Sequence, residues 1–249
     1  MKLSPHCYAV LGMAYCPPWA VNAGFIAGEH TTLVVDAGPH AQGAATLFGY
    51  AGAVRPGNNL RLLNTERHLD HIGGNAYFHT RGVESYGHPA IRRSDAELAA
   101  SIAECNACIP GRVRRNAQEA ALIFAGTHIA NPTHALGNEA SFDLGGGIEV
   151  QIIPTPGHTP TNLSAWLLEE GVLYCGDTLL NGYIPNLEGG TPDDWRIWLA
   201  SLEQIASLAP TTIVPGHGWV LQGEAIEQEM DRIGKILKQA ISHGKAPTV

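Results

Sequence analysis

The stretch of sequence that decides the fold is Thr65-Glu66-Arg67-His68-Leu69-Asp70-His71-Ile72-Gly73-Gly74. It follows an apolar run that we expect to form a strand, and it places four potential metal ligands within six residues: Glu66, His68, Asp70 and His71. A strand end holds side chains at a rigid sheet margin, and the two glycines let the following backbone turn tightly. Asp70 and His71 are adjacent, so in an irregular loop they can face away from Glu66 and His68. That arrangement suits two neighbouring cations.

Three later segments each place one further candidate ligand after a predicted strand. They are Pro156-Gly157-His158-Thr159-Pro160, Tyr174-Cys175-Gly176-Asp177-Thr178 and Val214-Pro215-Gly216-His217-Gly218. Functional residues gather on loops positioned by a rigid scaffold. A lone His after a strand is more often structural than a ligand. The four segments together predict one metal centre.

The composition limits the classes of function. With 249 residues, of which 45% are hydrophobic, the chain can bury a sizeable core. The formal net charge of −8 argues against nucleic acid or an anionic membrane as a partner, because both need an excess of Lys and Arg. We therefore expect a small-molecule substrate.

The start of the chain and its cysteines give expectations about the cellular compartment. No stretch approaches the roughly 18–20 apolar residues that cross a bilayer. The first residues lack the apolar core of a signal peptide, so we expect a cytoplasmic protein. The chain has five cysteines, and an odd number does not suggest a disulfide scaffold. Cys105 and Cys108 have C-x-x-C spacing, which we interpret as a pair on a helix rather than a redox or zinc site.

The hydrophobic pattern predicts strands, then a helical insert, then strands and helices again. Strands are expected at 8–14, 20–27, 31–36, 60–65, 83–86, 142–144, 148–153, 163–168, 172–175 and 211–214. Helices are expected at 40–54, 73–78, 94–107, 112–124, 191–208 and 223–242, with Thr191 and Pro192 as a strong helix start. Residues 127–138 should form irregular loop. Two such halves fit a sandwich of two mixed sheets with helices outside.

Taken in order, these segments resemble the metallo-β-lactamase superfamily from about residue 20 to about residue 220. The family motif H-x-H-x-D-H, followed by glycines, stands here as Glu66-x-His68-x-Asp70-His71. The resemblance implies an α/β fold, an αββα four-layer sandwich of two mixed β-sheets flanked by helices. We expect residues 1–249 to form this single domain, with a helical insert at about 90–138.

The resemblance also implies two divalent cations, with Zn²⁺ the expected metal. The first cation would be held by Glu66, His68 and His158. The second would be held by Asp70, His71 and His217. Asp177 would bridge both, and a hydroxide between the metals would attack a carbonyl or phosphoryl centre. Asp70 is the expected catalytic residue, orienting that hydroxide and passing a proton to the leaving group.

Glu66 departs from the family, which has His at this position. A carboxylate can still bind a cation through oxygen. With Glu66, Asp70 and Asp177 all coordinating, the site is less positive than usual. It should acidify its water less and favour harder metals such as Mn²⁺ or Fe²⁺. The first site is then either altered in metal preference or weaker than the second.

Asp177 narrows the chemistry that the resemblance implies. Thioesterases of the type II glyoxalase kind, lactonases and phosphodiesterases carry an Asp at the bridging position, whereas true β-lactamases usually lack it. We expect hydrolysis of an ester, thioester, lactone, amide or phosphoester. An iron-dependent oxidoreductase on the same fold, a β-lactamase-like amide hydrolase and a non-catalytic binding protein stay open.

The remaining candidates concern the substrate pocket. An apolar wall is expected from Trp19, Tyr183 and Ile184, together with Leu187. Trp195 and Trp198 have the spacing of core residues on one helix. We interpret Arg112, Arg114 and Arg115 as the solvated start of a helix, and His128 or His134 could reach over the site from the insert.

Overall fold

The computed structural model describes residues 1–13, 20–108, 127–128, 130–137, 140–187 and 190–246. The strands are β1 (Cys7–Met13), β2 (Val21–Ala27), β3 (Thr31–Val35), β4 (Asn59–Leu63), β5 (Glu84–Gly87), β6 (His134–Ala135), β7 (Ser141–Asp143), β8 (Glu149–Pro154), β9 (Leu163–Leu167), β10 (Val172–Leu180), β11 (Thr212–His217) and β12 (Leu221–Gln222). The helices are α1 (Ala41–Val54), α2 (Leu69–Ile72), α3 (Asn75–His79), α4 (Asp95–Cys108), α7 (Pro192–Ser207) and α8 (Glu224–His243), with a 3-10 turn, η1 (Leu168–Glu170).

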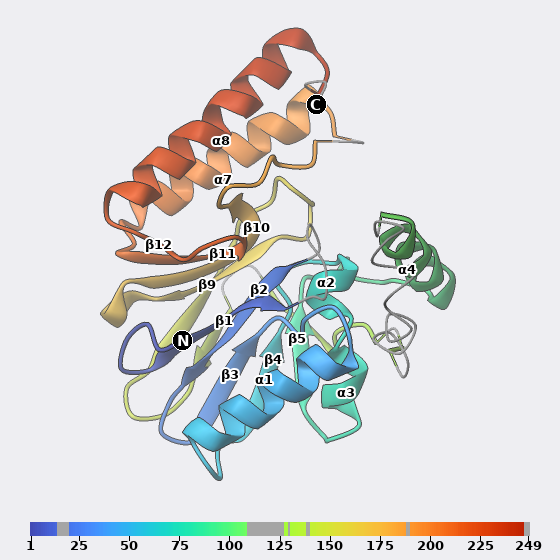
Figure 1. Cartoon of the computed structure of the whole chain (residues 1–249). Helices are drawn as coiled ribbons and strands as arrows, with labels where there is room; N and C mark the ends of the chain where they lie inside the picture. The colour runs from blue at the N-terminus through green and yellow to red at the C-terminus, as the bar shows by residue number, and fades with distance from the viewer. Residues whose placement is uncertain (14–19, 109–126, 129, 138–139, 188–189, 247–249) are drawn as a thin grey trace.

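Hydrogen bonding joins the strands of the described residues into one curled sheet with two halves (Figure 1). The first half runs from β6 through β5, β4 and β3 to β2, and the second from β11 through β10, β9 and β8 to β7. Both halves mix parallel and antiparallel pairs. They meet at a single register pair, His217 of β11 with Val21 of β2. The predicted two mixed sheets are thus the two halves of one continuous sheet.

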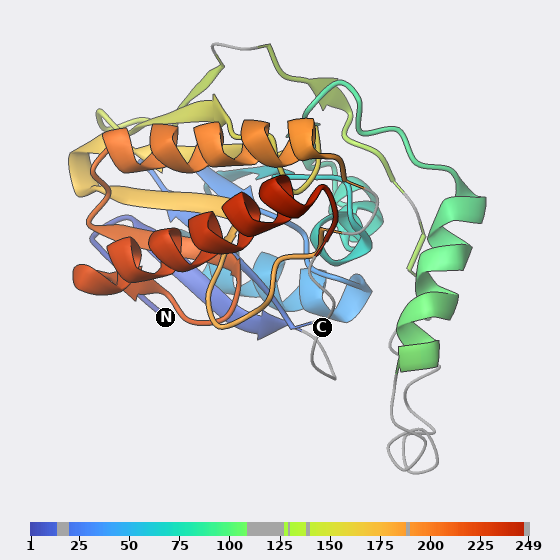
Figure 2. The same ribbon diagram turned by 90° about the horizontal axis from the view of Figure 1, so that it is seen from above.

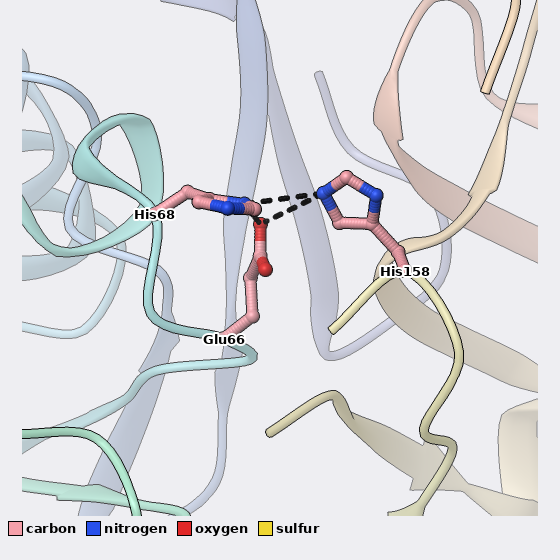
Figure 3. Close-up of side chains that lie close together, drawn as sticks. All are labelled: Glu66, His68 and His158. Atoms are coloured by element: carbon pink, nitrogen blue, oxygen red, sulfur yellow. Dashed lines mark hydrogen bonds and ion pairs between the residues drawn. The ribbon is translucent and has the colours of Figure 1, made fainter. Parts of the chain in front are cut away.

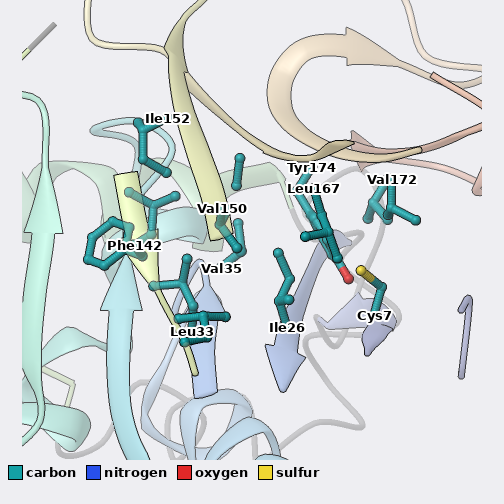
Figure 4. Packing of buried hydrophobic residues seen from close by; sticks show 14 of the residues in the cluster. Cys7, Ile26, Leu33, Val35, Phe142, Val150, Ile152, Leu167, Val172 and Tyr174 are labelled. Carbon is teal, nitrogen blue, oxygen red and sulfur yellow. The ribbon is translucent and has the colours of Figure 1, made fainter. Parts of the chain in front are cut away.

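Alternation of side chains along the strands builds the layers. In β3, Leu33 and Val35 pack into the core between the sheet halves, and Val34 packs outward under α1. In β10, Tyr174 faces the same central core, and Leu173 packs outward under α7 and α8. Successive strand residues point to opposite faces, so each buried strand serves two cores. Figure 4 shows the central core, where residues of both halves interdigitate. The αββα sandwich is therefore confirmed.

Helices cover the outer faces of both halves. α1 lies against the first half, while α7 and α8 pack side by side over the second (Figure 1). α4 stands to one side of these layers, as Figure 2 shows, and contacts α2. None of the helices in the described ranges has the length and apolar character needed to span a bilayer.

Most predicted elements within the described residues are present within a residue or two, and two of the differences, at β10 and β11, concern candidate ligands. β10 continues to Leu180 and β11 to His217, so Asp177 lies inside a strand rather than after one. The register between β10 and β11 shifts at Gly176, where the backbone φ is 50°. Such an irregularity lets a strand continue while it re-aims a side chain. His134 and Ala135 form the short β6 instead of loop.

Several interpretations concern residues outside the described ranges. These are the predicted helix at 112–124, with Arg112, Arg114 and Arg115, and the substrate-wall residue Trp19.

Cys105 and Cys108 lie in the helix α4, as predicted.

The N-terminal cap of α7, which was predicted from the sequence, can be tested by mutation. Thr191 accepts a hydrogen bond from the backbone N–H of Asp194, and the Asp194 carboxylate accepts one from the backbone N–H of Thr191. We expect Thr191→Ala to lower the free energy of unfolding by about 1 kcal/mol, because the cap would be lost. Urea unfolding measures this. Thr46→Ala, at an exposed position within α1, is the matched control, and it should be neutral or slightly stabilising. Equal losses in both variants would contradict the role of the cap.

Candidate metal centre

The sandwich brings all seven predicted ligands to one end of the sheet. Glu66 and His68 follow β4 directly, and the single-turn helix α2 carries Asp70 and His71. The other three come from the second half, with His158 after β8, Asp177 within β10 and His217 at the end of β11. Ligands from both halves therefore converge.

Glycines at this end permit the close packing that the site needs. A Cβ on Gly73 would collide with the backbone oxygen of Pro39, and a Cβ on Gly216 would collide with the carboxylate of Asp177. The role of Gly73 is thus close approach of two backbone segments. Gly216 leaves room for the Asp177 side chain beside β11.

The first ligand group consists of Glu66, His68 and His158 (Figure 3). Glu66 Oε1 lies 2.8 Å from His68 Nδ1 and 3.7 Å from His158 Nε2, and the two histidine nitrogens are 3.1 Å apart. The Glu66 side chain is fully buried, whereas 44% of the His68 side chain is exposed. Three potential ligand atoms thus face one another, and the His68 side chain is the one of them that reaches solvent substantially.

The second ligand group consists of Asp70, His71 and His217. Asp70 Oδ2 lies 3.3 Å from His217 Nε2 and 3.9 Å from His71 Nε2. All three residues are buried. This group lies deeper than His68.

Asp177 lies between the two groups. Its Oδ2 is 3.4 Å from His158 Nε2, while its Oδ1 is 3.3 Å from both His71 Nε2 and His217 Nε2. One carboxylate therefore faces donors of both groups, each through a different oxygen.

Two ligand imidazoles are oriented by acceptors behind them. Asp36 Oδ2 accepts a hydrogen bond from His71 Nδ1 at 2.8 Å, and the backbone oxygen of Ala20 accepts one from His217 Nδ1 at 2.8 Å. Thr65 donates to Asp36 through both its backbone N–H and its hydroxyl. Each ring is thereby held with Nε2 toward the site, which is how outer partners tune metal ligands.

Sequence reasoning missed Asp36, which it took as the stop of a strand. Its backbone has a φ of 63°, in the left-handed region that only a few non-glycine residues adopt. An Asp at the end of a buried strand, before Gly38 and Pro39, was the available signal. Nothing in the sequence spacing connects it to His71.

His158 is held differently, by packing against α7. Its ring lies 5.6 Å from that of Trp198, edge to face, and its Nδ1 is buried without a hydrogen-bond partner in the described residues. The indole N–H of Trp198 donates to the backbone oxygen of Thr178, next to Asp177. Trp198 is a core residue, as predicted, and it also contacts a candidate ligand.

Buried charges shift the pKa values of the site strongly. The Glu66 carboxylate raises the pKa of His68 to about 9. Burial lowers the pKa of His217, but Asp177 and Asp70 outweigh it and raise the value to about 11. Burial raises the pKa of Asp70, yet His71 and His217 hold it at about 2. Carboxylates and imidazoles thus stabilise one another's charged forms.

The donor set fits metal ions. His71 Nε2, Asp177 Oδ1 and Glu66 Oε2 are buried and form no hydrogen bond with the described residues. His71 Nε2 and Asp177 Oδ1 face each other at 3.3 Å. Buried polar atoms without hydrogen-bond partners are costly, so this arrangement favours a bound group. Imidazole nitrogens and carboxylate oxygens are the ligands of Zn²⁺, Mn²⁺ and Fe²⁺.

Of the predicted wall residues, Tyr183 lies beside the candidate ligand His217, and Ile184 is exposed on the same loop. The Tyr183 ring is 5.5 Å from that of His217, and Ile184 is 56% exposed. The guanidinium of Arg232 on α8 donates to the backbone oxygen of Tyr183 and fixes this loop. Leu187 is instead buried under α7 and α8. His134 stacks on Tyr86 at the sheet edge.

Comparison with known proteins agrees with this geometry. Residues 16–217 match the family model of the metallo-beta-lactamase superfamily, and the chain belongs to that superfamily. A metallo-beta-lactamase family protein of Thermus thermophilus has the same fold, with a TM-score of 0.71, 19% identity, and coverage of 97% of this chain and 82% of that chain.

Two curated relatives match shorter segments. The beta-lactamase-like protein 2 homolog of Caenorhabditis elegans is 38% identical over 104 residues, which are 39% of this chain and 33% of the relative. A hydroxyacylglutathione hydrolase of Xylella fastidiosa is 32% identical over 114 residues, which are 45% of this chain and 42% of the relative. The matches thus span less than half of either relative.

The acceptor behind His71 gives a first prediction for the site. Asp36→Ala should weaken metal binding by about 10- to 100-fold, because His71 loses the partner that orients it. Titration of the metal-free protein with Zn²⁺ against a competing chelator measures the affinity. Asp143→Asn, at an exposed carboxylate, is the control and should leave it unchanged. Unaltered affinity in Asp36→Ala would show that His71 needs no orienting group.

Protonation of the metal-free site gives a second prediction. With the pKa of His68 at about 9 and that of His217 at about 11, both imidazoles carry protons at neutral pH. A cation must replace those protons, so its affinity should fall as the pH is lowered and its binding should release protons. Calorimetric titration in buffers of different ionisation enthalpy counts them. Binding without proton release at neutral pH would contradict the prediction.

Proposed function

We propose that this chain is a dinuclear metal-dependent hydrolase and that it cleaves a thioester of a small molecule. The observation that carries the proposal is the position of Asp177, whose two oxygens face two separate ligand groups at 3.3–3.4 Å. A single cation would not need a carboxylate placed in this way. The similarity to a hydroxyacylglutathione hydrolase, whose name denotes a thioester substrate, supports the choice of substrate.

The ligands divide between the two cation positions as the groups do in space. The first position is assigned to Glu66, His68 and His158. The second is assigned to Asp70, His71 and His217. Asp177 serves both. Divalent cations bound there would polarise the substrate carbonyl and bring the pKa of a water molecule toward neutrality.

Asp70 is proposed to handle the proton. Its pKa of about 2 keeps the carboxylate ionised at neutral pH, and its Oδ2 lies at the centre of the second group beside His217. An ionised carboxylate at this position can accept a hydrogen bond from the attacking water and orient it. It can then hold the proton released and pass it to the leaving sulfur.

Tyr183 and Ile184 are proposed as the wall that receives the acyl group. Tyr183 contacts the ligand His217, and Ile184 presents an exposed aliphatic side chain on the same loop. An apolar wall beside a polar centre suits a substrate with a hydrophobic part next to a reactive carbonyl.

The test is hydrolysis of a small set of model substrates by protein loaded with Zn²⁺, Mn²⁺ or Fe²⁺. We expect an acylglutathione thioester to be cleaved faster than an aryl ester, a lactone, a phosphodiester or a β-lactam. Chelation should abolish the activity and added metal should restore it. Asp70→Asn should lower kcat by about 10²- to 10⁴-fold, as loss of a general acid–base group does.

Asp143→Asn is the matched control for a surface carboxylate, and its kcat should equal that of the wild type. Metal-loaded protein that cleaves none of the five substrates would refute the proposal. Cleavage that survives complete removal of metal would refute it too.

A further inference from the structure

The Glu66 carboxylate lies close to candidate ligands of both groups. Its Oε1 lies 2.8 Å from His68 Nδ1 in the first group, and the same atom lies 3.3 Å from His71 Nε2 in the second. Asp177 Oδ1 is also 3.3 Å from His71 Nε2. The Glu66 carboxylate is therefore as close to His71 Nε2 as the Asp177 carboxylate, which lies between the two ligand groups.

The two 3.3 Å distances are those of ligands that share an ion, whereas the 2.8 Å between Glu66 Oε1 and His68 Nδ1 is a hydrogen-bond distance. Donor atoms about 2.0–2.1 Å from one tetrahedral cation lie roughly 3.3–3.4 Å from each other. Glu66, His71 and Asp177 form a ligand group in their own right, alongside the two groups described above. The group spans both cation positions.

The charge of Glu66 needs compensation from within the site. Its side chain is fully buried and its Oε2 has no hydrogen-bond partner among the described residues. The neighbouring Arg67 points its guanidinium away, to Glu97. A buried carboxylate is stable only when it is paired or coordinates a metal.

We propose that Glu66 is a ligand of both cations, so that the centre has two bridging carboxylates, Glu66 and Asp177, and prefers Mn²⁺ or Fe²⁺ to Zn²⁺. This inference rests on the dinuclear site of the proposed function. The preference follows because each added carboxylate oxygen favours harder cations, whereas imidazole suits zinc. The substitution of Glu for His thus changes the centre as a whole.

The experiment tests the two cation positions separately, in two variants that each lack one ligand of one position. His158→Ala removes a ligand of the first position only, and His217→Ala removes one of the second only. Glu66→Gln is then added to each background. The affinity for Mn²⁺ is measured from the electron paramagnetic resonance signal of the free ion during titration of metal-free protein.

We expect Glu66→Gln to weaken Mn²⁺ binding at least about tenfold in both backgrounds, as loss of a direct ligand should exceed loss of an outer partner. Weakening only in the His217→Ala background would make Glu66 a ligand of the first cation alone, and would overturn the proposal. Unchanged affinity in both backgrounds would overturn it as well. Asp143→Asn in each background is the matched control.

Metal preference gives an independent readout. Wild-type protein dialysed against equal Mn²⁺ and Zn²⁺ is compared with Glu66→His by elemental analysis. The ratio of bound Mn²⁺ to bound Zn²⁺ should fall by roughly tenfold or more in the variant, since imidazole replaces carboxylate. An unchanged ratio would contradict the inference. Circular dichroism confirms folding, and Glu66→Asp, which keeps the charge on a shorter side chain, replaces Glu66→Gln if that variant does not fold.

Failure of this inference and failure of the proposed function are distinguishable, because neither readout uses a substrate. Protein that binds two cations through Glu66 but cleaves no substrate refutes the hydrolase and leaves the shared ligand standing. Protein that cleaves a thioester but binds metal independently of Glu66 refutes the shared ligand and leaves the proposed hydrolase standing.

Discussion

Mutual repulsion of buried carboxylates is the constraint on which this structure depends. Asp36, Glu66, Asp70 and Asp177 are all buried at one end of the sandwich. Moving each ionised carboxylate out of water costs several kcal/mol, and closeness to the others adds to that cost. Three candidate-ligand histidines, His68, His71 and His217, have raised pKa values in response, so protons can offset part of the charge. Divalent cations would offset it more completely and would release those protons.

The two halves of the sheet meet beside the candidate metal centre. Each ligand group takes residues from both halves, so a cation at either position links them. The joint between the halves is the pair His217–Val21, and His217 is itself a candidate ligand whose Nδ1 donates to Ala20. A cation held by His217 and the closure of the sheet would therefore stabilise the same contact.

The sequence predicted the layers and the candidate ligands better than it predicted their support. The β-branched run of β3, the apolar run that begins β10 and the caps of α7 are local signals that each strand or helix carries by itself. The hydrogen bond from His71 to Asp36 joins residues 35 positions apart, and no local pattern encodes it. The contact of Trp198 with His158 is equally non-local, and the spacing of Trp195 and Trp198 indicated only a buried helix face. The end of β10 was placed too early because Gly176 interrupts its apolar run, although a shifted register lets the strand continue.

For Glu66, the sequence motif alone and the three-dimensional structure lead to different interpretations. Judged alone, a carboxylate in a histidine's place predicts a first site that is either altered in metal preference or weaker than the second. In the fold, that carboxylate is fully buried and lies within 3.3 Å of a donor from the other group. Glu66 is surrounded by candidate ligands, and the hydrogen bond from His68 Nδ1 compensates part of its charge. Cations at both positions would compensate it more completely.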